Sequence, residues 1–236
     1  IKSNIYTYKG KYVNEFEKKF ARFFKSKYAV MVNSGSSANL ISVASLFFKK
    51  KKPLKKGDEV IVPTLSWSTT YYPLQQYGLK LKFVDIDIET LNVNVDSIIK
   101  ACTKKTKLIV AVNILGNPMD LFKLRLFCKK RNIYLMEDNC ESIGAKINGK
   151  YAGTFGIVNT FSTFFSHHIS TIEGGIVLTD DFEIYNLLLS LRSHGWTRDL
   201  SKNFYLKKDQ KKYENYCFTL PGYNVRSTNL NAAIGV

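Results

Sequence analysis

Two adjacent histidines offer the clearest proton-transfer chemistry in the sequence. His167 and His168 follow a Ser-containing run and precede the string EGG at 173–175. The pKa of imidazole lies near neutrality, which suits a general acid or base. A metal site is the alternative, but no HxxxH or Cys/His spacing surrounds the pair. We therefore expect an acid–base role and no bound metal.

A second candidate is the carboxylate of Asp138, in the string MEDNCE at 136–141. The apolar run before it predicts a buried strand that ends at this residue. A carboxylate in such a place needs a cationic partner, and a protonated pyridine nitrogen is one well-suited partner. The alternative is that Asp138 only caps the loop that follows.

The third candidate is the string NSGSSAN at 33–39, between a predicted strand and a predicted helix. Gly35 permits a tight turn, and Ser36 and Ser37 can cap the helix. Free N–H groups and hydroxyls at a helix N-terminus bind phosphate. The alternative is a plain capped helix without a ligand.

The elements that position these residues alternate between strands and helices. Apolar runs predict strands at 28–32, 59–62, 81–84, 108–112, 133–136 and 176–178. Helical periodicity covers 15–24, 40–48 and 121–130, and the chain ends in an apparent helix at 230–236. This alternation predicts an α/β fold: a mostly parallel sheet with helices on both faces. Ligands bind at the carboxyl edge of such sheets.

The net charge of +16 arises from 35 basic and 19 acidic side chains. Such an excess is compatible with nucleic-acid or anionic-membrane binding. The one dense block, 49–52 with Lys55 and Lys56, follows a predicted helix, where the helix dipole favours lysine. We interpret it as a solvated terminus and expect neither partner. Four cysteines without zinc or redox spacing, and no secretory signal, predict free thiols in the cytoplasm.

The chain resembles the DegT/DnrJ/EryC1/StrS family of pyridoxal-phosphate (PLP) sugar aminotransferases, through motifs that follow the family order over essentially the whole sequence. The motifs are SGSSAN (34–39), GDEVIVPT (57–64), FVDID (83–87), GNP (116–118), ED (137–138), EGG (173–175), GYNVR (222–226) and AAIG (232–235). The resemblance implies the three-layer αβα large domain of fold-type-I PLP enzymes. We expect residues 1–236 to be this domain, with a smaller C-terminal domain missing.

The departure from the family pattern lies at His167. In the aminotransferases a lysine at this position attaches covalently to PLP, whereas residues 151–201 here contain no lysine. A histidine there is similar to the 3-dehydratase branch, which removes the C3 hydroxyl of nucleotide-linked 4-keto-6-deoxy sugars. One group of these enzymes carries an iron–sulfur cluster on clustered cysteines. Cys217 stands alone here, so the resemblance favours the cluster-free group, which acts on a GDP-linked sugar.

The resemblance also implies roles for the phosphate-binding residues and an assembly. Ser36 and Ser37, helped by Ser162, would hold the phosphate of noncovalently bound PLP or its amine form, pyridoxamine phosphate (PMP). Asn224 would reach that phosphate from a partner subunit, so we expect a homodimer with shared sites.

Around the cofactor ring, Trp67 would stack on the pyridine, unless it is a core residue. Asp138 would pair with the ring N–H⁺, and Glu141 would contact the ring O3′. The expected reaction uses L-glutamate as amino donor and His167 as the proton-transfer group. Two alternatives stay open: an ordinary sugar aminotransferase, and a noncatalytic PLP-fold protein or basic nucleic-acid binder.

Overall fold

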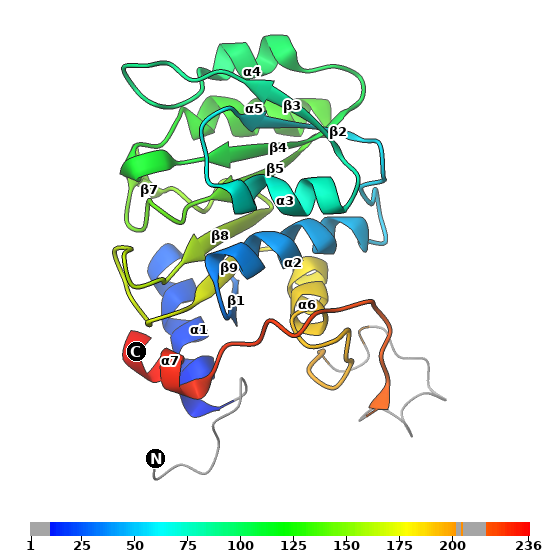
Figure 1. The fold of residues 1–236 in the computed structure, drawn as a ribbon, viewed down its shortest axis with the longest axis vertical. Helices are drawn as coiled ribbons and strands as arrows, with labels where there is room; N and C mark the ends of the chain where they lie inside the picture. The colour runs from blue at the N-terminus through cyan, green and yellow to red at the C-terminus, as the bar shows by residue number, and fades with distance from the viewer. Residues whose placement is uncertain (1–9, 202–203, 205–215) are drawn as a thin grey trace.

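The protein is described here from a computed structural model, in which residues 10–201, 204 and 216–236 are placed. Its centre is a seven-stranded sheet in which only the strand second from one edge runs against the others (Figure 1). In spatial order the strands are β1 (Tyr28–Val32), β9 (Gly175–Thr179), β8 (Val158–Ser162), β5 (Tyr134–Asp138), β4 (Thr106–Val112), β2 (Glu59–Pro63) and β3 (Lys80–Val84). The expected mostly parallel α/β sheet is confirmed.

Helices cover both faces of the sheet and make three layers (Figure 1). One face packs against α2 (Gly35–Phe47), α3 (Ser68–Gln76) and α6 (Phe182–Leu191). The other face packs against α1 (Lys11–Phe24), α4 (Val95–Ala101) and α5 (Leu121–Arg131), with α7 (Asn229–Gly235) lying on α1. In β2, Val60 and Val62 enter the first core, whereas Ile61 enters the second. Strands buried on both faces read as continuous apolar runs, which is why the sequence reveals them.

Smaller elements complete the described chain. They are a 3₁₀ turn η1 (Ile114–Gly116) and a two-stranded hairpin of β6 (Lys146–Ile147) and β7 (Lys150–Tyr151). Within the placed residues no helix is long and apolar enough to span a membrane.

Two local expectations differ from the structure. The helix expected at 40–48 begins at Gly35, and its N-cap is Ser34, whose side chain accepts the Ser37 N–H at 3.0 Å. Ser36 and Ser37 therefore lie in the first turn and do not cap it. The six expected strands missed β8, because three of its five residues are polar. Asn159, Thr160 and Ser162 are nevertheless buried.

Beside β9, the carboxyl edge of the parallel strands is tightly packed. A Cβ on Gly175 would meet the Ser34 carbonyl oxygen at 2.2 Å, and one on Gly174 would meet the Thr163 hydroxyl at 2.3 Å. The two glycines of the EGG string thus let β9 begin directly against the loop that starts α2.

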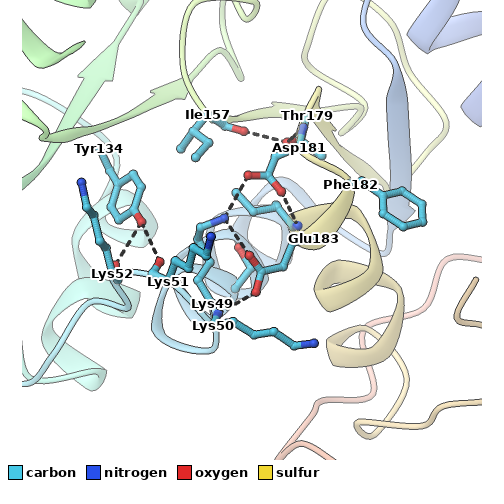
Figure 2. A network of polar contacts seen from close by, with 12 residues as sticks. Lys49, Lys50, Lys51, Lys52, Tyr134, Ile157, Thr179, Asp181, Phe182 and Glu183 are labelled. Atoms are coloured by element: carbon cyan, nitrogen blue, oxygen red, sulfur yellow. Dashed lines mark hydrogen bonds and ion pairs between the residues drawn. The ribbon is translucent and has the colours of Figure 1, made fainter. Parts of the chain in front are cut away.

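At the opposite edge a lysine joins two helices. The ammonium of Lys49, just after α2, lies 2.9 Å from Asp181 and 3.2 Å from Glu183, at the start of α6 (Figure 2). Asp181 also caps α6 by accepting the Ile184 N–H. Burial lowers the pKa of Lys49, but the two carboxylates outweigh it and leave the pKa above its usual value.

Candidate active site

A cavity of about 420 Å³ opens at the carboxyl edge of the sheet. Six of the residues predicted from the sequence line it: Ser36, Trp67, Asp138, Glu141, Ser162 and His167. They come from the beginnings of α2 and α3, the ends of β5 and β8, and the loops after those strands. The structure therefore brings together side chains that are up to 131 residues apart in sequence, as between Ser36 and His167.

Asp138 ends β5 and is 5% exposed. Its Oδ2 accepts hydrogen bonds from Asn39 Nδ2 at 2.9 Å and Thr70 Oγ1 at 2.8 Å, and its Oδ1 accepts the Cys140 N–H at 3.2 Å. No lysine, arginine or histidine in the described ranges forms an ion pair with it. A buried carboxylate without a cation of its own is suited to a cationic ligand group.

Its sequence neighbour Glu137 points to the other face of the sheet and is fully buried. The backbone N–H groups of Gly153, Phe155 and Gly156 donate to its carboxylate at 2.6–2.8 Å. Burial raises the pKa of Glu137 above its usual value, and these three bonds only partly oppose that rise. Glu137 therefore anchors a loop and does not line the cavity.

The start of α2 forms one wall of the cavity. Ser34 satisfies the N–H groups of Ser37 and Ala38, while an α-helix has no internal acceptors for its first amides, here those of Gly35 and Ser36. Ser36 Oγ lies 3.0 Å from Thr69 Oγ1. A Cβ on Gly35 would meet Ser162 Cβ at 2.7 Å, so the glycine lets the helix start against β8. Ser37 itself does not line the cavity.

Trp67 is the N-cap residue of α3 and is 75% exposed, although it lines the cavity. The alternative of a core tryptophan is therefore wrong. Glu141 accepts the N–H of Leu115 at 3.0 Å, and Leu115 has a left-handed backbone with φ of 51°. Glu141 thereby ties the loop after β4 to the loop after β5.

The two histidines differ in position. His167 lines the cavity. Its backbone N–H donates to the Phe164 carbonyl at 3.0 Å within a turn. His168 is exposed and does not line the cavity. The lining residues include a histidine but no lysine within the described part of the chain. A proton-transfer group is thus present in this cavity, and no lysine amine of the described residues lies beside it.

Asn224 lies outside the cavity. It pairs with Ser193 in an isolated antiparallel bridge, and its Oδ1 accepts from Arg226 Nε at 3.0 Å. The segment that carries it crosses the 193–195 turn closely, since a Cβ on Gly222 would meet the Gly195 nitrogen at 2.0 Å.

Sequence reasoning missed two buried contacts of Asp138. Asn39 belongs to the string SGSSAN but was not singled out. Thr70 lies three residues after Trp67 and was not singled out either. Cys140, also in the cavity wall, was treated only as a free thiol. Burial first, and then the Asp138 carboxylate, raise the pKa of Cys140 well above its usual value, so the thiol stays neutral.

The chain is similar to characterised sugar-modifying enzymes. It is 57% identical over 230 residues to the GDP-4-keto-6-deoxy-D-mannose 3-dehydratase of Escherichia coli O55:H7, covering 96% of this chain and 59% of that enzyme. It is 36% identical to a GDP-perosamine synthase of Vibrio cholerae, covering 100% of this chain and 59% of the synthase. The chain thus spans about three fifths of the length of these relatives.

The fold matches a solved structure of GDP-4-keto-6-deoxymannose-3-dehydratase with a trapped PLP-glutamate geminal diamine. The TM-score is 0.94 at 56% identity, over 99% of this chain and 61% of that one. The family model of the DegT/DnrJ/EryC1/StrS aminotransferases matches residues 1–236. The chain belongs to the DegT/DnrJ/EryC1/StrS aminotransferase family.

Proposed function

We propose that this chain is the cofactor-binding part of a PLP/PMP-dependent 3-dehydratase that removes the C3 hydroxyl of GDP-4-keto-6-deoxymannose. The observation that carries the proposal is the lining of the cavity, which contains His167 and, among described residues, no lysine. An imidazole transfers protons but does not form the covalent attachment that a lysine amine forms with PLP. The 57% identity to a dehydratase supports the same conclusion.

The residues present fit the cofactor. The Asp138 carboxylate carries a negative charge without a protein cation in the described ranges, and a pyridinium N–H⁺ supplies one. The first turn of α2, with Ser36 and Ser162 beside it, presents amides and hydroxyls that suit a phosphate. Trp67 exposes its indole at the cavity, where a flat ring could stack on it.

When bound, the cofactor supplies an electron sink through its protonated ring. The protein's part is to keep that ring protonated through Asp138, to hold the phosphate through the α2 turn, and to move a proton. The imidazole of His167 accepts the proton whose removal allows the C3 hydroxyl to leave. The lack of a lysine in the described lining keeps the cofactor noncovalent and available to the sugar ketone.

The substrate and amino donor in this proposal follow the relatives. GDP-4-keto-6-deoxymannose is the sugar named for the dehydratase, and glutamate is the amino acid trapped with PLP in the solved structure. The product would be a 3-deoxy sugar for a surface polysaccharide. The four cysteines form no disulfide, which suits a reducing cytoplasm.

The proposal includes a homodimer with shared sites. It is supported by Asn224, which lies on the chain surface outside the cavity of its own subunit. The test is co-expression of two differently tagged inactive variants, His167→Asn and Asn224→Ala. If Asn224 serves the partner's site, each mixed dimer has one intact site, and about a quarter of the wild-type activity returns on random pairing. If Asn224 serves its own subunit, no activity returns.

The main experiment mixes the intact protein with PLP, L-glutamate and GDP-4-keto-6-deoxymannose. Release of ammonia together with a 3-deoxy sugar is the expected result. A parallel sample is treated with borohydride, which should leave no cofactor covalently attached to the protein. A 4-amino sugar without ammonia, or PLP fixed to the chain by borohydride, would overturn dehydration and favour the aminotransferase activity that the 36% identical synthase represents.

A further inference from the structure

Two neutral side chains converge on one oxygen of the Asp138 carboxylate. Asn39 Nδ2, from α2, and Thr70 Oγ1, from α3, lie 2.9 Å and 2.8 Å from Oδ2. Asn39 and Thr70 are each 2% exposed. Both contacts are therefore shielded from water. A hydrogen bond to a charged group has a larger effect in such a buried place than it has in water.

The direction of both bonds is fixed by a second pair of hydroxyls. Thr160 Oγ1 donates to Asn39 Oδ1 at 2.7 Å, so the amide must turn its NH₂ group toward Asp138. Ser66 Oγ donates to Thr70 Oγ1 at 2.9 Å, which leaves the Thr70 hydrogen for Asp138. Two donors, each oriented by another residue, thus face Oδ2.

This arrangement treats the two carboxylate oxygens unequally. Oδ2 accepts two side-chain bonds at 2.8–2.9 Å, whereas Oδ1 accepts the longer 3.2 Å bond from the Cys140 N–H. The neutral Cys140 thiol also hydrogen-bonds to the carboxylate. A thiol is a weak donor, so Oδ1 is the oxygen on which a ligand N–H⁺ meets the weaker competition. Since every donor is neutral, the carboxylate keeps its full charge for a ligand.

We propose that Asn39 and Thr70 are positioning residues, which hold the Asp138 carboxylate rotated so that Oδ1 meets the pyridinium N–H⁺ of the cofactor. This inference rests on the proposed function. Neutral donors orient the carboxylate without cancelling its charge, whereas a lysine or arginine in the same place would cancel it. Their effect reaches the cofactor only through Asp138.

Other titratable groups stand near this pair. Cys140, Glu141, His167 and Glu173 line the same cavity, and Glu137 is adjacent in sequence on the opposite face of β5. Tyr71, next to Thr70 on α3, has its pKa raised by burial and, to a lesser extent, by the Asp138 charge. The variants below leave all of these side chains in place.

The test compares Thr70→Val, Asn39→Leu and the control Thr70→Ser in the intact protein. Valine and leucine keep approximately the shape but remove the donor, whereas serine keeps the hydroxyl. PLP affinity is measured by absorbance titration, and the protonation of bound PLP by the pH dependence of its absorption band. We expect the two donor deletions to weaken PLP binding about tenfold each, in line with a hydrogen bond to a charged group. The band transition should move to lower pH by about one unit, while Thr70→Ser stays near wild type.

The outcomes separate this inference from the proposed function. Failure of the wild-type protein to bind PLP would overturn the proposed function itself. Wild-type binding that is lost in Asp138→Asn but unchanged, with the same band transition, in Thr70→Val and Asn39→Leu would overturn only the positioning role. Thermal unfolding of each apo variant identifies loss of folding. The two donors come from different helices, so if only one of the variants Thr70→Val and Asn39→Leu folds, that variant tests the positioning role. If neither folds, Ser66→Ala tests it, because Ser66 orients the Thr70 hydroxyl; the expected shift is then smaller.

Discussion

Asp138 and Asp181 are both carboxylates at the carboxyl ends of strands, Asp138 as the last residue of β5 and Asp181 just after β9. They lie at opposite edges of the sheet and are stabilised in different ways. Asp138 is held by an amide, a hydroxyl and a backbone N–H, all neutral. Asp181 has the ammonium of Lys49 at 2.9 Å (Figure 2). At the cavity edge the negative charge is left for a ligand to match. At the other edge the protein matches it internally and joins α2 to α6.

The comparison explains why changes at the two edges should appear in different measurements. A buried charge without a protein partner is available to a ligand, whereas removing one partner of a buried ion pair leaves the other charge uncompensated and destabilises the fold. Variants at the cavity edge should therefore change activity or PLP affinity with little effect on unfolding. Variants at the Lys49 edge should do the reverse.

The largest expected effect is that of His167→Asn at the cavity edge. Removing a general base lowers the dehydration rate by roughly 10²–10⁴-fold, while PLP binding and the unfolding temperature should stay close to wild type. Ammonia release at saturating substrate measures the rate. His168→Asn is the matched control, since His168 is exposed and outside the cavity lining. A greater loss in the His168 variant would reverse the assignment of the two imidazoles.

Asp138→Asn should have the next largest effect. Asparagine keeps an oxygen acceptor but removes the charge that matches the pyridinium, so PLP affinity should fall roughly 10–100-fold, as for a lost charge-assisted hydrogen bond. The free energy of unfolding of the apo protein in urea should change by less than about 1 kcal/mol, because no cation among the placed residues is paired with Asp138. A large fall in apo stability with unchanged PLP affinity would contradict the comparison.

Lys49→Met tests the opposite edge. The variant leaves Asp181 and Glu183 without their ammonium, and they are only 29% and 21% exposed. Their partial exposure reduces the penalty for a broken buried pair, so the free energy of unfolding should fall by about 1–3 kcal/mol. PLP affinity should not change. The exposed Lys51, two residues along the chain, provides the control Lys51→Met, with an expected change within about 0.5 kcal/mol.

The smallest effect is a pH dependence at the same edge. Burial raises the pKa of Asp181, but the Ile184 N–H and Lys49 outweigh it and hold the pKa below its usual value. A lowered folded-state pKa stabilises the protein above the usual aspartate range, and this contribution is lost as pH falls through the lower value. Urea unfolding between pH 6 and about pH 3 should therefore show a steeper loss in wild type than in Lys49→Met. Equal slopes would show that Lys49 does not set the Asp181 pKa.

The sequence predicted the parts of the fold that depend on short apolar runs. All six expected strands exist. Most of them are buried apolar runs, whereas the edge strand β3 carries Lys80 and Lys82 and is mostly exposed or half-buried. β8 was missed since Asn159 and Thr160 are polar, and their burial depends on partners distant in sequence, such as Leu178 and Asn39. The helix cap was misplaced by the three serines at 34–37, which only the backbone geometry distinguishes.

For the site, individual residues were predictable but their supports were not. His167 and Asp138 stand out by type and by position after strands. The contacts of Asp138 with Asn39 and Thr70 span 99 and 68 residues, and no local pattern encodes such distances. The roles of all the predicted site residues stay predictions; the structure places six of them around one cavity, whereas Ser37 and Asn224 lie outside its lining.

The position of the antiparallel strand β9, between β1 and β8, has a consequence for synthesis of the protein. β1 stands at the sheet edge, and its one neighbour in the sheet is β9, some 150 residues later in the chain. A chain made from its N-terminus therefore carries an unpaired β1 until residues 175–179 have been added. The Ser34–Gly35 loop, which begins α2 and abuts Gly175, is set only at that moment. The wall of the cavity at the start of α2 is thus completed only after residues 175–179 have been made, so a chain stalled before residue 175 would lack this wall.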